Sequence, residues 1–121
     1  MPDSAISYST EEMNGWLLWQ LRGRLDRTTA EAAAAEGEKQ LSACQKLALD
    51  LSGLSYISSA GIRTILKLVG GAEQAGRPIA VISPEGMVKE ILEMARLDMF
   101  ITICSSAEEL ENALERNGRH D

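Results

Sequence analysis

From residue 46 onward the chain alternates short apolar segments with longer amphipathic ones. The apolar segments are KLALDLSGL (46–54), IAVIS (79–83) and FITIC (100–104). Between them lie two segments with the spacing of a one-sided apolar helix, at Ile62, Ile65, Leu66 and Val69, and at Val88, Ile91, Leu92 and Ala95. Short strands that alternate with such helices form α/β domains in which the sheet is at least partly parallel.

A β-hairpin is expected before this alternating part. The segment ISYSTEEMNGWLLWQLRGRLD (6–26) contains two strand-like runs around Asn14–Gly15, the strongest short signal for a hairpin turn. Alternate residues of the second run form two faces of a strand. The expected core face is Leu17, Trp19, Leu21 and Gly23, and the opposite face is Trp16, Leu18, Gln20 and Arg22.

Two more helices complete the expected fold. The first lies in TTAEAAAAEGEKQLSAC (28–44), where a threonine supplies the N-cap. The last lies in SSAEELENALER (105–116), where Ser106 and Glu109 have the spacing of a capping box. The predicted order is ββαβαβαβα: one α/β domain over residues 1–121, with a core from about 5 to 115, a frayed tail at 116–121, and a small mixed sheet of about five strands covered by about four helices.

The charge of the chain argues against two classes of partner. Its 121 residues carry a net charge of −6, and the pI is about 4.8. Neutralising phosphates requires clustered Lys and Arg, and the densest local group, Arg22, Arg24 and Arg27, is short and contains Asp26. We therefore expect no nucleic-acid partner, and an anionic membrane surface would repel the chain for the same reason.

Targeting and redox signals favour the cytoplasm. No run of about eighteen apolar residues is present, and MPDSAISYSTEE (1–12) lacks the features of a signal peptide. Cys44 and Cys104 stand sixty positions apart, without a CxxC pair. That spacing favours two reduced, part-buried thiols over a zinc site, although a disulfide between them stays open.

Signatures of catalysis and of cofactor binding are missing from the sequence. The single histidine is His120, close to the chain end, so no positioned base for a nucleophile is evident. Neither GxxxxGK[ST] nor GxGxxG occurs, and no metal-ligand spacing is found. We expect a protein that is not an enzyme and holds no cofactor or metal.

The strand-to-helix junction at LSYISSAGI (54–62) is the most informative stretch. One interpretation is purely structural: Ser58 and Ser59 are N-cap residues, and an N-cap side chain stabilises its helix by about 1 kcal/mol. A cap needs only one serine, and Gly61 in the first turn costs up to ~1 kcal/mol relative to alanine. The glycine indicates close approach of another backbone or a bulky group. A helix N-terminus also favours an anion, so a phosphate on a serine would be tolerated there.

Two stretches resemble the STAS domain, the fold of bacterial anti-sigma-factor antagonists. LALDLSGLSYISSAGIRTIL (47–66) is similar to the family signature of an apolar strand, an Asp, and a Ser-containing turn that enters a helix. LRGRLDRTTA (21–30) is similar to the segment that ends the family's second strand. Where many phosphorylated members have Asp before the acceptor serine, this chain has Ser58. The resemblance covers about residues 5 to 115.

The resemblance implies a site and a set of partners. Ser59 falls at the phospho-acceptor position. The implied partner surface comprises Asp26, Thr28, Thr29, Ser58, Ala60, Gly61, Ile62 and Arg63. Such antagonists bind an anti-sigma factor that is also a serine kinase, which frees a sigma factor; the kinase phosphorylates them with ATP to break the complex, and a serine phosphatase resets them. Two alternatives stay open: a STAS scaffold or transporter-regulating module without phosphorylation, and a carrier of a nucleotide or lipid.

Overall fold

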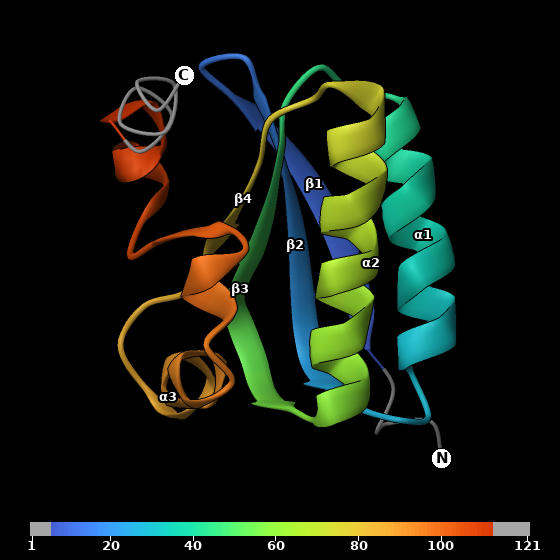
Figure 1. Ribbon diagram of the computed structural model, residues 1–121, viewed down its shortest axis with the longest axis vertical. Helices are drawn as coiled ribbons and strands as arrows, with labels where there is room; N and C mark the ends of the chain where they lie inside the picture. The colour runs from blue at the N-terminus through green and yellow to red at the C-terminus, as the bar shows by residue number, and fades with distance from the viewer. Residues whose placement is uncertain (1–5, 113–121) are drawn as a thin grey trace.

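The computed structural model describes residues 6–112 as one layered α/β unit (Figure 1). The strands are β1 (Ser7–Met13), β2 (Trp16–Leu25), β3 (Leu47–Ile57), β4 (Ile79–Ile82) and β5 (Thr102–Cys104). The helices are α1 (Ala30–Ser42), α2 (Ser59–Ala75) and α3 (Met87–Met94), with short 3₁₀ turns η2 (Leu97–Met99) and η3 (Ala107–Glu109). The predicted element order is confirmed through β5. The predicted last helix (105–116) is described only to residue 112, and the tail 116–121 lies outside the described residues.

The five strands form one mixed sheet in the order β1-β2-β3-β4-β5. β1 and β2 pair antiparallel as the predicted hairpin, and both turn residues, Asn14 and Gly15, have positive φ. The other three pairings are parallel. The carboxyl ends of β2 and β3 therefore lie at the same edge of the sheet, where Leu25 pairs with Ile57.

The first part of β2 is buried on both faces, which corrects the expectation of a single core face. Trp19 and Leu21 belong to the main core, as predicted. Trp16 and Leu18 are equally buried, because the opposite face of the sheet forms a second core with Leu110. Where a strand is covered on both faces, its alternation carries little information about which set faces inward; only farther along β2, at Arg22 and Arg24, do side chains reach solvent.

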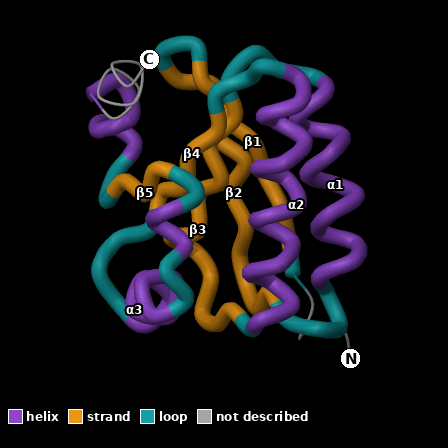
Figure 2. The backbone as a smooth tube through the Cα atoms, viewed as in Figure 1, coloured by secondary structure: helices purple, strands orange, loops and turns teal. Residues whose placement is uncertain are grey.

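Helices α1 and α2 lie side by side over one face of the sheet, and α3 covers the same core near β3 (Figure 2). The predicted stripe of α2 is confirmed at Ile65 and Val69. Leu66 is instead exposed, and Leu68 takes a core position. The stripe of α3 holds at Val88 and Leu92. Ala95 is exposed, because α3 has already ended at Met94.

The predicted side-chain caps do not form as expected. Thr29 and Ser58 occupy the N-cap positions of α1 and α2, but neither side chain caps its helix. Ser106 precedes η3 without a side-chain cap as well, and Glu109 accepts a hydrogen bond from the backbone of Ser105 instead, at 3.0 Å. At none of the three junctions does the hydroxyl form the predicted cap of the helix that follows.

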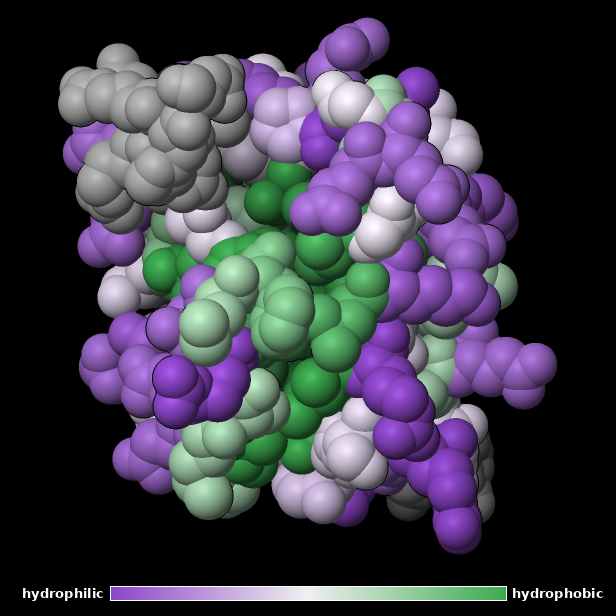
Figure 3. Space-filling view, in the orientation of Figure 1, coloured by the Kyte–Doolittle hydropathy of each residue, from purple (hydrophilic) through white to green (hydrophobic). Residues whose placement is uncertain are grey.

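Helix α2 separates an apolar surface from a charged one (Figure 3). Hydrophobic side chains form a continuous band on the α3 side of α2, whereas hydrophilic side chains cover the α1 side. The largest exposed apolar residues are Leu66, Met87, Met94, Met99 and Phe100.

Candidate functional site

The two motif segments meet at the carboxyl edge of the parallel strands. The loop from β2 to α1 and the turn from β3 to α2 lie at the same end of the molecule (Figure 2). The backbone N–H of Ser58 donates to the carbonyl oxygen of Leu25 at 3.0 Å, which ties the two segments together. A site formed here combines residues from both motifs, although about thirty positions separate them in the chain.

Gly61 makes this close approach possible. A Cβ atom at position 61 would lie 2.7 Å from the carbonyl oxygen of Leu25 and 2.8 Å from Cγ1 of Ile57. Such distances leave no room for a side chain, because one of the two contacted groups is fixed backbone. The expectation that glycine allows another backbone to approach is confirmed, and that backbone is the end of β2.

The loop 26–29 is held by its own side chains. One carboxylate oxygen of Asp26 accepts from the backbone N–H of Thr28 at 3.0 Å and from its hydroxyl at 2.7 Å. Hydrogen bonding from Thr28 is the largest of several causes that lower the pKa of Asp26 below its usual value. The hydroxyl of Thr29 donates to the carbonyl of Arg24 at 2.9 Å and accepts from the N–H of Asp26 at 3.0 Å. Thr29 is therefore buried and fixes the loop instead of capping α1.

Arg24 borders the site but is already engaged. Its Nε donates to the second carboxylate oxygen of Asp26 at 3.3 Å. Its guanidinium also lies over the ring of Tyr56, 4.5 Å from the ring centre. Gly23, in the motif segment 21–30, precedes Arg24 and has a φ of +107°, a value that favours glycine. The β2–β3 register breaks at the same place.

The two adjacent serines differ in access. Ser59 is exposed on the first turn of α2. The hydroxyl oxygen of Ser58 is buried and has no hydrogen-bond partner in the described part of the chain. Of the two hydroxyls, only that of Ser59 is presented to a second protein.

A shallow depression of about 400 Å³ surrounds these serines, and we call it the Ser59 hollow. It is lined by Arg24, Asp26, Arg27, Thr28, Tyr56, Ser58, Ser59, Ala60 and Arg63. The structure thus brings together most of the predicted interface residues. Two of them, Thr29 and Gly61, lie buried beneath the surface, and Ile62 is half-buried against the main core.

Three residues of the Ser59 hollow were missed by the sequence reasoning. Arg24 and Arg27 were counted only as a short basic group, and Tyr56 was not considered. The available signal was that Arg24 and Arg27 lie inside the motif segment 21–30. What the sequence does not show is that this loop lies against the serine turn.

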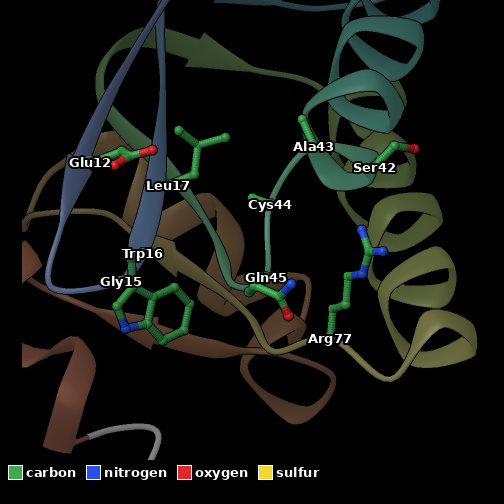
Figure 4. Close-up of a pocket in the computed structure, with 9 residues that line it drawn as sticks. All are labelled: Glu12, Gly15, Trp16, Leu17, Ser42, Ala43, Cys44, Gln45 and Arg77. Atoms are coloured by element: carbon green, nitrogen blue, oxygen red, sulfur yellow. The ribbon is translucent and has the colours of Figure 1, made fainter.

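A second hollow, of about 320 Å³, lies at the opposite end of the sheet and includes Cys44, so we call it the Cys44 hollow (Figure 4). Arg77 enters it and donates from Nη1 to the carbonyl of Leu41. Burial raises the pKa of the Cys44 thiol, and the nearby Arg77 cation opposes part of that rise. No disulfide joins Cys44 and Cys104, in agreement with the expected reduced state; Cys44 is half-buried and Cys104 is buried.

The described part of the chain offers neither a metal cluster nor a membrane-spanning helix. Residues 6–112 contain no group of three or more His, Cys, Asp or Glu side chains that could hold a metal ion. Over the same residues, no helix combines the length and the apolar character needed to cross a bilayer. His120 lies outside the described residues.

A family model described as "Mlab, STAS domain" matches residues 18–103. The chain belongs to the STAS domain family. The match spans both motifs that carried the resemblance, and this STAS domain has the sheet order and serine turn described above. The STAS family of anti-sigma factor antagonists is generally non-enzymatic.

Relatives and solved structures of the STAS domain agree with this assignment. The chain is 27% identical over 104 residues to BtrV of Bordetella bronchiseptica, a proposed anti-sigma factor antagonist; the alignment covers 85% of this chain and 90% of BtrV. An anti-sigma factor antagonist from Mycobacterium paratuberculosis has the same fold, with a TM-score of 0.78 at 18% identity over 94% of this chain and 95% of that one. Unphosphorylated SpoIIAA, from Bacillus, matches with a TM-score of 0.63 at 16% identity over 93% and 99% of the two chains.

Proposed function

We propose that this STAS domain is an anti-sigma factor antagonist controlled by phosphorylation of Ser59. Unphosphorylated, it binds an anti-sigma factor that is also a serine kinase, so that a sigma factor is released in the cytoplasm. Phosphorylation of Ser59 ends this binding, and a serine phosphatase restores the first state. The observation that carries the proposal is an exposed Ser59 hydroxyl on the first turn of α2, beside the loop 26–29.

The relatives support the same class of function. BtrV is a proposed antagonist of an anti-sigma factor. SpoIIAA has been solved in both an unphosphorylated and a phosphorylated form. A phosphorylation cycle in this chain would follow the same two states.

The chemistry of the step requires only an accessible hydroxyl from this chain. The oxygen of Ser59 forms a bond to the γ-phosphorus of ATP while the bond from that phosphorus to the β-phosphate oxygen breaks. The hydroxyl proton passes to a base of the kinase, and ADP leaves. Water later cleaves the phosphoserine in the phosphatase, which returns the hydroxyl and releases inorganic phosphate.

The surface around Ser59 fits a contact with a protein partner. Of the eight residues assigned to the interface, the exposed or half-exposed ones would touch the partner: Asp26, Thr28, Ser58, Ala60, Ile62 and Arg63. Thr29 and Gly61 would act indirectly, by fixing the loop and by allowing β2 to approach α2.

A phosphate at position 59 would break an interface without unfolding the domain. It adds roughly −1.5 to −2 charges. Like-charge contact and desolvation at an interface cost several kcal/mol, and a loss near 4 kcal/mol weakens a complex about a thousandfold. At the start of α2 the same charge is favourable by ~0.3–2 kcal/mol. Folding and release therefore do not oppose each other.

Phosphorylation by the anti-sigma kinases of the source organism tests the proposal. Each purified kinase is incubated with the protein and Mg-ATP, and the product is weighed intact and mapped by peptide mass spectrometry. We expect one phosphoryl group, on Ser59. The Ser59→Ala variant stays unmodified, and the matched Ser58→Ala variant is still phosphorylated, because the Ser58 oxygen is buried.

Binding of the same kinases completes the test. Ser59→Asp is expected to weaken the complex strongly while its thermal unfolding stays close to wild type, and Ser59→Ala is expected to bind without being released by ATP. A kinase that binds the chain but never modifies it would favour the scaffold alternative. Modification of Ser59→Ala would place the acceptor elsewhere and contradict the proposal.

A further inference from the structure

Two arginines next to Ser59 have no partner among residues 6–112. Arg27 and Arg63 are exposed, and neither guanidinium makes a hydrogen bond or an ion pair with a described residue. The four lysines of the chain are all paired, Lys39 with Glu36, Lys46 with Glu111, Lys67 with Glu38, and Lys89 with Glu85. Arg22 also lacks a hydrogen bond or ion pair with a described residue, but it lies in a separate hollow away from Ser59. In a chain of net charge −6, two unpaired cations beside the exposed Ser59 are a candidate site for an anion.

Both arginines stand where two depressions join. The Ser59 hollow continues into a groove of about 490 Å³ between α1 and α2, and Arg27, Ala60 and Arg63 line both. We call the second depression the α1–α2 groove. Its other lining residues are Ala30, Glu31, Ala34, Ala35, Glu38, Thr64 and Lys67. The small side chains leave the arginines open to a group that enters from outside.

The carboxylate that lines the Ser59 hollow does not neutralise these arginines. Asp26 uses one oxygen for Thr28 and the other for Arg24. In the α1–α2 groove, Glu38 pairs with Lys67, which leaves Glu31 as the other acidic group facing it. The charge at the Ser59 end is therefore positive: Arg24, Arg27 and Arg63 against Asp26.

The spacing of Ser59 and Arg63 suits an ion pair. They are four positions apart on α2, so their side chains project from the same helix face, with Cβ atoms about 5–6 Å apart. A guanidinium offers a planar fork of donors that matches phosphate and carboxylate oxygens. Arg27 approaches the same hollow from the β2–α1 loop.

We infer that Arg27 and Arg63 form an anion-binding pair that serves two anions in turn. Before phosphorylation the pair binds a carboxylate of the partner, so the partner presents an acidic segment to the Ser59 hollow and the α1–α2 groove. After phosphorylation the pair binds the phosphate on Ser59 of its own chain. The phosphate thus releases the partner in two ways: it occupies Arg27 and Arg63, which had bound the partner's carboxylate, and it repels that carboxylate. This inference rests on the proposed function for the partner and adds the chemistry that recognises it.

The phosphate half of the inference is tested without any partner. Phosphoserine is introduced at position 59 during translation, and the ³¹P NMR signal is followed against pH. The second pKa of an ordinary phosphoserine is about 6. Arg27 and Arg63 stabilise the dianion, so we expect a value lower by about 0.5 or more. Arg63→Gln and Arg27→Gln each raise it again, and the double variant raises it most.

Arg22 supplies a matched control for this measurement. It is exposed and lines a separate hollow with Gln20, Asp50 and Ser52, away from α1 and α2. Arg22→Gln changes the net charge by the same amount and is expected to leave the phosphoserine pKa where it was. An unshifted pKa in the wild-type chain, or one that responds equally to all three variants, overturns the phosphate site.

The partner half is tested with the unphosphorylated protein and the kinase found above. Arg27→Glu and Arg63→Glu are each expected to weaken kinase binding at least tenfold, whereas Arg22→Glu binds as wild type does. Thermal unfolding of each variant verifies that it is folded. If wild type binds and Ser59→Asp releases while both arginine variants still bind fully, this inference fails and the proposed function stands. If wild type binds no kinase, the proposed function fails. The phosphate site is then tested only by the phosphoserine pKa measured by NMR.

Discussion

The two ends of the sheet carry similar residues that are used in opposite ways. At the Cys44 end, Arg77 donates to the carbonyl of Leu41, and Lys46 lies over the ring of Trp16, 5.3 Å from its centre. At the Ser59 end, Arg27 and Arg63 face open hollows and make no hydrogen bond or ion pair with any residue from 6 to 112. Both ends have an arginine-lined depression of a few hundred cubic ångströms (Figure 4 shows the first).

The difference shows that the bonding state of a side chain says more about its role than its type does. A cation bonded to a carbonyl near the end of a helix stabilises the fold and offers little to a ligand. An unpaired, solvated cation contributes little to the fold and is available for an incoming anion. The hydroxyls follow the same rule, since Thr29 holds a loop and Ser59 faces outward.

The largest expected effect concerns the junction that builds the Ser59 end. Gly61→Val places side-chain atoms against the Leu25 carbonyl and Ile57, and we expect a loss of about 3 kcal/mol in the free energy of unfolding, measured by urea denaturation. Gly70→Ala, on the same helix with nothing within 4 Å of its added Cβ, is the control and should gain about 0.5–1 kcal/mol. Equal effects at the two positions would show that β2 and α2 do not approach as described.

An intermediate effect is expected when the arginines of the two ends are compared directly. Arg77→Met removes the donor to the Leu41 carbonyl and should cost about 1–2 kcal/mol of stability, with no effect on phosphorylation of Ser59. Arg63→Met should change stability by less than about 0.5 kcal/mol, because Arg63 is exposed and has no partner in the described chain. Chemical denaturation measures both; a reversed order of the two losses would contradict the comparison.

The smallest expected effect is a pH dependence of the loop 26–29. The pKa of Asp26 is lowered in the folded protein, so the bonds it accepts are fully present above the ordinary aspartate pKa and are lost as pH falls through the lower folded value. NMR titration of the Asp26 carboxyl should give a midpoint below about 3.9. Thr28→Val removes the largest cause of the lowering and should raise this midpoint, while Arg24→Gln should raise it less.

Local sequence patterns predicted the elements well where one principle dominated. Asn14–Gly15 gave the hairpin, and the apolar strands at 46–54 and 79–83 gave the parallel sheet. The predictions failed where packing decided between nearly equivalent choices. Leu66 and Leu68 fit a helical stripe about equally, and only the position of α2 on the sheet buries Leu68.

The candidate site was predicted in part for the same reason. Ser59, Ala60 and Arg63 are neighbours in the chain, and their place at the start of a helix follows from the sequence. The contribution of Arg27 and Tyr56 depends on which strands are adjacent. Likewise, the sequence offers two serine hydroxyls, and burial of the Ser58 oxygen is a property of the folded junction.

The sequence by itself determined the order of strands and helices, the glycine at position 61 and a serine-bearing turn after a buried strand, because these follow from local periodicity and from the chemistry of single residues. Only the tertiary structure decided which side chains share a surface with that turn. Parallel pairing of β2 with β3 brings the carboxyl ends of both strands to one edge, so Arg27 and Arg63 flank Ser59 although 36 positions separate the arginines in the chain.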